Sequence, residues 1–168
     1  LLVLVQIGFK DALLDSATAI DRHLDADLIM IPRALEYLGS DHTFSQAQLY
    51  QCLGDPGVQD VEPLYARLST FRNIETGYTR SVMILGVDPS RRSLTLPSLK
   101  GKLHLLKTPG NVLFDRFAMD LYGPVIPRLK KEGPYHVVVN DQRAWLAGDF
   151  ELGASFAASG NVVTSTAT

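Results

Sequence analysis

The first 24 residues constrain the fold of this chain more than any other segment. The chain begins with five aliphatic residues, Leu1 to Val5, and its first charge is Lys10. From Phe9 to Leu24, apolar residues recur every three or four positions with acidic residues mainly between them, which is the pattern of an amphipathic helix. Because no proline interrupts the segment, the sequence predicts one continuous helix with an apolar head and a polar-faced body.

The apolar head is too short to cross a membrane by itself. A span needs about 20 apolar residues, and only residues 1–9 qualify. A signal peptide is disfavoured too, because the charges follow the apolar residues and no small-residue cleavage site comes after them. The segment is then either a buried helix or the last turns of a membrane helix.

Composition narrows the class of protein. At 168 residues, with 46% hydrophobic and 20% charged residues, the chain is long enough to bury a core. Its 16 basic and 18 acidic residues nearly cancel, and no basic patch is evident, so nucleic acid is not an expected partner. The single cysteine, Cys52, excludes an internal disulfide and a thiolate metal cluster.

The segments after the first helix predict a mixture of strands and short helices. The apolar stretch Asp27–Ile31 reads as a buried strand, and Ser45 with Gln48 forms a capping box that begins a short helix. A turn at Glu75–Gly77 predicts a long antiparallel hairpin. Residues 88–110, rich in proline and glycine, predict an irregular excursion.

The C-terminal half adds further elements. Strands are predicted at Asn111–Asp115, Val137–Val139, Arg143–Leu152 and Asn161–Thr164. A second short helix is expected at Arg116–Tyr122, a hairpin turn near Asn140, and a β-bulge at Gly148. The small residues of Gly153–Gly160 favour a tight strand crossing. The predicted fold class is therefore α+β: a long N-terminal stalk helix, an antiparallel or mixed sheet with β-hairpins, and two further short helices.

No residue pattern for catalysis is found. The four histidines have no metal-ligand spacing, and GASFA at Gly153–Ala157 lacks the second glycine of a nucleophile elbow. Asp149 and Glu151 share one strand face, where a solvated surface is the favoured interpretation. We therefore predict no enzyme activity, no catalytic or metal residues and no cofactor, and favour a binding or mechanical role.

Taken in order, several phrases of the sequence resemble one family across essentially the whole chain. The most specific phrases are LFDR (Leu113–Arg116), YGP (Tyr122–Pro124) and GDFELGASFAASGN (Gly148–Asn161). Together they resemble the periplasmic domain of MacB-like ABC-transporter permeases, and within that group the DevC type of cyanobacterial exporters. The resemblance implies a MacB-like periplasmic core domain at the plasma (inner) membrane, with this part of the chain in the periplasm.

The resemblance also implies the domain organisation and the partners. Residues 1–9 would end the first transmembrane helix, emerging at Phe9, Lys10 and Asp11, and residues 10–168 would form a partial periplasmic domain with a protruding sub-lobe at about 73–110. Expected partners are an ABC ATPase subunit, a periplasmic adaptor (membrane-fusion) protein, a TolC-like outer-membrane channel and a second permease copy. The implied function is export of lipid-like or other hydrophobic substrates, with the domain docking the adaptor and transmitting ATP-driven motion.

The candidate adaptor contacts lie in the irregular excursion, at Leu99, Lys100, Lys102 and Leu103. Three alternatives stay open. A free-standing periplasmic lipid- or ligand-binding domain would require a large apolar pocket, and a small α/β hydrolase would require a nucleophile with a base nearby. A permease of the lipoprotein-releasing type would share the architecture.

Overall fold

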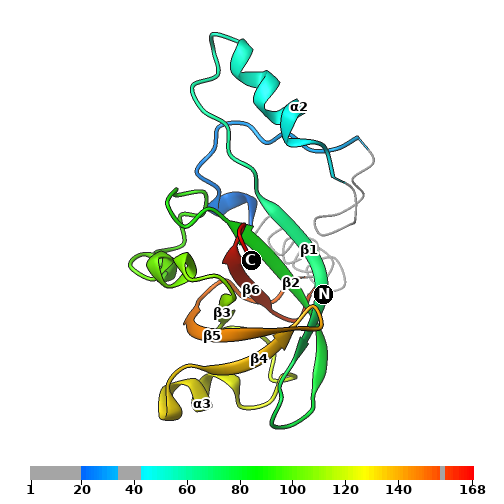
Figure 1. Ribbon diagram of the computed structural model, residues 1–168, viewed down its shortest axis with the longest axis vertical. Coiled ribbons are helices and arrows are strands. Elements are labelled where there is room, and N and C mark those ends of the chain that lie inside the picture. Colours follow the sequence, from blue (N-terminus) through cyan, green and yellow to red (C-terminus); the bar gives the residue numbers. More distant parts are fainter. Residues whose placement is uncertain (1–19, 34–42, 156–157) are drawn as a thin grey trace, which may run out of the picture.

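Six strands close into a barrel (Figure 1). A computed structural model describes residues 20–33, 43–155 and 158–168. The strands are β1 (Tyr65–Arg72), β2 (Thr79–Val87), β3 (Asn111–Asp115), β4 (Tyr135–Val139), β5 (Gln142–Phe150) and β6 (Asn161–Ser165). Their order around the barrel is β1-β2-β6-β3-β5-β4, and β4 pairs back onto β1 through Phe71 and Val139.

The pairing combines local hairpins with long-range parallel contacts. The β1–β2 and β4–β5 pairs are antiparallel hairpins, and β3–β6 is antiparallel as well. The β2–β6 and β3–β5 pairs are parallel. Because parallel neighbours cannot be joined by a tight turn, these pairs connect strands that lie far apart in the sequence.

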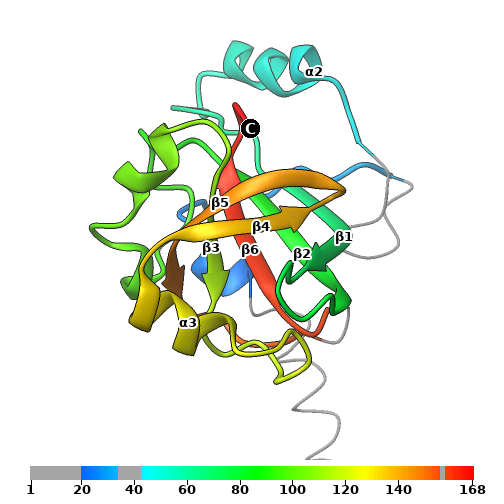
Figure 2. The ribbon, with the colours of Figure 1, turned by 60° about the horizontal axis from the view of Figure 1, so that its bottom comes forward.

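Short helices lie around the barrel (Figure 2). The α-helices are α2 (Gln46–Gln51) and α3 (Val125–Glu132), and the 3-10 helices are η1 (Asp21–His23), η2 (Cys52–Gly54), η3 (Pro97–Leu99) and η4 (Leu103–Lys107). Helix α3 packs near the turn region of the β1–β2 hairpin, where Arg128 pairs with Glu75 at 3.0 Å.

Two clusters of buried side chains form the core. One is aromatic, with the Phe71 and Phe114 ring centroids 4.7 Å apart and the edge of Tyr122 against both rings. The other is aliphatic and joins β2, β3 and β6 to the excursion of residues 88–110, whose Leu99 and Leu106 are fully buried. The excursion is therefore part of the core.

Several local predictions are confirmed. The Ser45 hydroxyl accepts from the Gln48 N–H while the Gln48 side chain accepts from the Ser45 N–H, so the capping box begins α2. Asn140 and Asp141 both adopt positive φ (52° and 58°), the geometry of a tight hairpin turn between β4 and β5. The register of β5 against β3 shifts beside Gly148, which is the predicted bulge.

The predicted fold class is wrong, because the strands close into a barrel and do not form an open sheet with a stalk helix and two short helices. Closure depends on the pairings of β6 with β2 and β3 and of β4 with β1. Residues 1–19 of the predicted stalk lie outside the described residues. At its described end, Asp21–His23 is a 3-10 helix and the chain is extended from Leu24. Within the described ranges, no helix has the length and apolarity needed to cross a membrane.

Two further elements were predicted wrongly. Asp27–Ile31 forms no strand, and its apolar side chains are exposed. Arg116–Tyr122 is a series of turns, and the helix begins only after Pro124. Pro127 fits in the first turn of α3 because the N–H groups there have no partner within the helix.

The turn of the β4–β5 hairpin provides a test of the barrel. Asp141→Val should lower the free energy of unfolding by about 1–2 kcal/mol, since a β-branched residue at positive φ is strained. Gln142→Val, in the adjoining strand, is the matched control and should change it little. Denaturant unfolding measures the free energy of unfolding of both variants. Equal losses in Asp141→Val and Gln142→Val would exclude strain at the turn as the cause.

Candidate functional site

The sequence segments that carry the family resemblance meet around one buried carboxylate. Asp115 ends β3 and is fully buried. Its Oδ1 accepts hydrogen bonds from the N–H groups of Phe117 (3.0 Å) and Leu152 (3.1 Å). Its Oδ2 accepts from the Gly153 N–H (2.9 Å) and the Asn161 Nδ2 (2.7 Å). Four donors thus stabilise the buried charge.

Asn161 connects the carboxylate to β6. Its Nδ2 also donates to the Gly153 carbonyl at 2.7 Å, while its Oδ1 has no hydrogen-bond partner within the described part of the chain. The two hydrogen bonds donated by Nδ2 therefore fix the orientation of the Asn161 amide. LFDR, at the end of β3, and the segment Gly148–Asn161 are joined by direct hydrogen bonds.

The YGP segment packs against the same region. The Tyr122 hydroxyl donates to the Ser81 carbonyl at 2.6 Å, and the Asn73 side chain donates to the Tyr122 carbonyl at 3.0 Å. Burial, followed by the charge of Asp115, raises the pKa of Tyr122 to about 12. The tyrosine is therefore a neutral hydrogen-bond donor that ties this segment to β2.

Gly160 allows the backbone before β6 to lie close to Ala118 and Tyr122. A Cβ atom at this position would lie 2.6 Å from the Ala118 Cβ and 3.1 Å from the Tyr122 ring. Only glycine fits without movement of the neighbouring backbone. The predicted tight crossing within Gly153–Gly160 is therefore confirmed at this residue.

A second polar group lies beside the first. Asp149 accepts from Lys102 Nζ and from Arg116 Nη2, both at 2.7 Å, and Arg116 Nη1 lies 2.6 Å from Glu151 Oε1. Partial burial alone would raise the pKa of Asp149, but the hydrogen bonds from Lys102 and Arg116 outweigh it and hold the pKa below its usual value. Asp149 and Glu151 do share one face, as predicted, and both are paired with cations.

The four predicted adaptor contacts have different environments. Leu99 is only 1% exposed and Leu103 packs against the aliphatic core, so neither presents a free side chain. Lys102 is bound to Asp149, and only Lys100 is exposed. The predicted emergence residues Phe9, Lys10 and Asp11 lie outside the described residues.

Residues 73–110, the predicted sub-lobe, include part of the barrel. They contain all of β2 and, in Leu99 and Leu106, two fully buried core residues. The part that protrudes consists of residues 25–33 and 43–62, which we call the lobe, and it carries α2 and η2 (Figure 1).

The carboxylates described above are held in hydrogen bonds and ion pairs. Both oxygens of Asp115 are saturated with donors, and the Asp149 group consists of ion pairs. No cluster of three or more potential metal ligands occurs among the described residues. Asn73 and Asn161, which the sequence analysis did not single out, are buried parts of this arrangement, and no local pattern distinguishes them from surface asparagines.

Two hollows lie against described elements of the fold. One, of about 210 Å³, lies between the end of β3 and the start of α3 and includes Phe114 and Ile126. The other, of about 510 Å³, lies between residues 30–33 and α2. The barrel interior itself is filled by side chains.

No protein-family model matches this chain, and no curated protein matches it. The family resemblance therefore rests on the sequence phrases alone.

Asp115 can be tested by an isosteric change. Asp115→Asn should lower the free energy of unfolding by about 2–4 kcal/mol, because an NH₂ group then faces backbone N–H donors in the interior. Asp120→Asn, at an exposed position, is the control. Chemical denaturation gives both values. A difference between the two variants within about 0.5 kcal/mol would show that the carboxylate is not essential.

The ion pairs of Asp149 predict a pH dependence. A depressed pKa in the folded state contributes stability above the pKa of the unfolded chain, about 3.9, and this contribution is lost as the pH falls through the folded pKa. Asp149→Asn should therefore lower stability by about 1–2 kcal/mol at pH 7, an amount limited by the partial exposure of Lys102 and Arg116. Its difference from the wild type should narrow below about pH 4. If the stability difference between Asp149→Asn and the wild type stayed constant down to roughly pH 2.5, the ion pairs of Asp149 would not be its cause.

Proposed function

We propose that this chain is a non-catalytic binding domain in the periplasmic part of an ABC-transporter permease that exports lipid-like or other hydrophobic substrates. One observation carries the proposal. LFDR and YGP lie close together in the sequence, the segment Gly148–Asn161 follows much later, and the three are joined through Asp115, Tyr122 and Gly160. Segments that contact one another form one structural unit, and this supports treating the three phrases together in the proposal.

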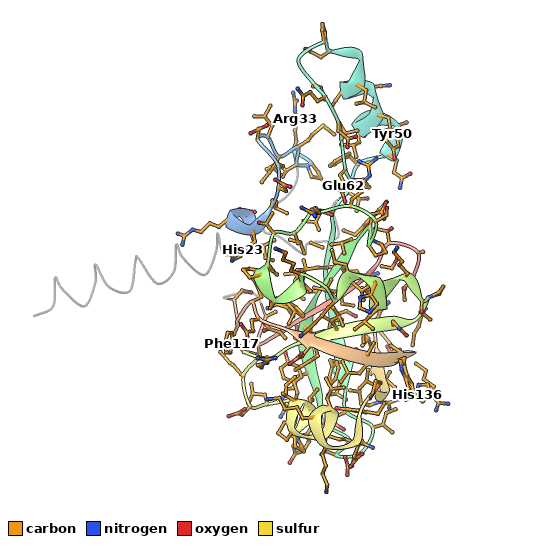
Figure 3. All side chains as sticks on the ribbon, turned by 90° about the vertical axis from the view of Figure 1, so that its left-hand side faces the viewer. His23, Arg33, Tyr50, Glu62, Phe117 and His136 are labelled. Atoms are coloured by element: carbon orange, nitrogen blue, oxygen red, sulfur yellow. The ribbon has the colours of Figure 1, made fainter. Side chains whose placement is uncertain are left out.

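A binding role is favoured over a catalytic one because the polar side chains are already engaged in hydrogen bonds and ion pairs. The carboxylates of the LFDR region are occupied by backbone donors or by paired cations, which leaves none poised as a general base. Exposed apolar side chains remain available, among them Leu28 and, after β3, Phe117 (Phe117 is labelled in Figure 3). Exposed apolar side chains that gather in one place mark interaction surfaces.

A closed barrel suits a domain that must pass on movement. Every strand is hydrogen-bonded on both sides, so a displacement applied at one end is transmitted with little internal deformation. In the proposed exporter, a separate ATPase subunit supplies the movement and the domain presents a docking surface to the adaptor. The adaptor would in turn connect to a TolC-like channel, and a second permease copy completes the assembly.

The alternative of a free-standing lipid carrier has less support. Such a protein needs an enclosed apolar cavity. In the described ranges, packed side chains fill the barrel interior, and the larger hollow is a surface groove beside α2.

Cysteine accessibility tests the proposal. The chain, with the residues that precede Leu1 in its gene, is expressed in a bacterial host in a Cys52→Ser background, with single cysteines at Leu4, Asp15 or Asp141. In intact cells, a membrane-impermeant thiol reagent should label Asp15→Cys and Asp141→Cys and leave Leu4→Cys protected. The protein should stay in the membrane fraction and co-purify with an ABC ATPase subunit.

Two outcomes would contradict it. Labelling at all three positions, with release by osmotic shock, would identify a soluble periplasmic protein. Labelling of Asp141→Cys only after the cells are permeabilised would place the barrel on the cytoplasmic side.

A further inference from the structure

The outside of the barrel is covered on one side and open on another. On β2, β3 and β6, one set of alternating side chains packs in the aliphatic cluster with residues 88–110, so the excursion covers these strands. On β4 and β5, the alternate side chains fill the aromatic cluster, whereas His136, Arg143 and Trp145 lie between them and are exposed. We call the outer side of β1, β4 and β5 that carries Arg72, His136, Arg143 and Trp145 the open face (Figure 1).

The strand register fixes the positions of two arginines on the open face. Arg72 of β1 is opposite Val138 of β4, and Val138 is opposite Arg143 of β5. Because neighbouring strands are about 4.8 Å apart, the two arginine Cα atoms are roughly 10 Å apart, on either side of Val138. Val138 points outward, since Val137 and Val139 belong to the aromatic cluster, yet it is only 9% exposed. Neighbouring side chains therefore lie over it.

An aromatic pair lies beside the arginines. His136 of β4 is opposite Trp145 of β5, two residues along each strand from Val138 and Arg143 (His136 is labelled in Figure 3). The two ring centroids are 4.5 Å apart and the rings meet edge to face, which restrains the tryptophan. Trp145 is nevertheless 38% exposed. Tryptophan and arginine are enriched among the residues that carry most of the energy of protein–protein binding.

The charge of the open face is not compensated within the part of the chain that the structure describes. There, neither Arg72 nor Arg143 forms an ion pair or a side-chain hydrogen bond. Strands β1, β2 and β4 contain no acidic residue, and Asp149 of β5 is held in ion pairs elsewhere. Asp141, in the turn between β4 and β5, is the nearest acidic residue in the sequence. The two arginines therefore favour an anionic partner.

The rest of the chain narrows the class of that partner. The chain has a net charge of −2, and Asp25, Asp27 and Asp55 are exposed on the lobe. A nucleic acid or an anionic bilayer extends beyond a single face and would meet these carboxylates as well as the arginines. An acidic segment of a protein can contact the open face alone, so this class of partner agrees best with the distribution of charge.

We propose that the open face docks an acidic segment of a partner protein. Carboxylates of that segment would pair with Arg72 and Arg143, and an apolar side chain would pack against Trp145. Every strand of the barrel is paired on both sides, so the segment binds through side chains and is not added to the sheet as a strand. The inference rests on the proposed function only for the partner's identity, an exporter subunit such as the adaptor.

Trp145 provides a readout at this face, because the chain has no other tryptophan. Two tryptophan-free peptides of about 18 residues are compared, each with a helical leucine stripe and with either glutamate or lysine at the polar positions. Glutamates seven residues apart on a helix are about 10.5 Å apart, close to the separation of the two arginine Cα atoms. Peptide anisotropy and tryptophan emission of the full chain are followed at about 50 and 300 mM NaCl.

The glutamate peptide should bind, more weakly at the higher salt concentration, and should shift the emission of Trp145 to shorter wavelength as water is displaced from the ring. The lysine peptide should leave the emission unchanged, even if it binds to the acidic lobe.

Matched variants locate the site. Arg72→Gln/Arg143→Gln should weaken the glutamate peptide about tenfold at low salt and remove most of its salt dependence. Arg92→Gln/Lys100→Gln removes the same charge from exposed positions of the excursion and should change the affinity less than about twofold. Trp145→Ala should weaken binding about tenfold. All four charged residues are exposed, so circular dichroism should show unchanged folding of both charge variants.

Several results would overturn the inference. They are no binding of the glutamate peptide up to about 1 mM, binding without a change in the Trp145 emission, and an affinity unchanged by Arg72→Gln/Arg143→Gln. A larger emission shift with phosphatidylglycerol vesicles or a single-stranded oligonucleotide would also overturn it. An emission shift that depends on the concentration of the chain alone, and that Arg72→Gln/Arg143→Gln abolishes, would assign the open face to a second copy instead.

None of these results depends on membrane topology. Failure here with the expected cysteine labelling rejects the docking face alone, and peptide binding with failed labelling rejects only the exporter.

Discussion

The buried carboxylate of Asp115 is the interaction on which the rest of the structure depends. A carboxylate removed from water is strongly destabilising unless donors replace its hydration. Here the donors come from the turn after β3, the link after β5 and the first residue of β6. All three segments must be in place together before the charge is stabilised. The barrel is thereby closed at this end by a polar group as well as by apolar packing.

The barrel and the lobe differ in the burial of their apolar side chains and in the sign of their charge. In the barrel, apolar side chains are buried, every strand is paired and the sequence carries an excess of basic residues. In the lobe, apolar side chains are exposed and acidic residues predominate. A net charge of −2 for the whole chain therefore conceals two parts of opposite sign. Because electrostatic attraction acts locally, within about a Debye length of roughly 10 Å, the charge of each part matters more for binding than the total.

The sequence-based predictions that are confirmed concern features set by residues close together in the sequence. The capping box at Ser45, the turn at Asn140 and the bulge at Gly148 each depend on a few neighbouring residues, and each was predictable. The strand predicted at Asp27–Ile31 failed for the opposite reason. An apolar run identifies residues that avoid water, but what covers them is decided elsewhere in the fold or by a partner.

The sequence by itself determined the hairpins, the helix cap at Ser45 and the tight crossing at Gly160, because each follows from local backbone preference or residue type. Only the tertiary structure decided that the strands close into a barrel, because closure depends on β6 entering between β2 and β3. It also decided that Leu99 is core while Leu28 is surface. Both are leucines in irregular segments, and burial is a property of the surroundings that local sequence does not encode.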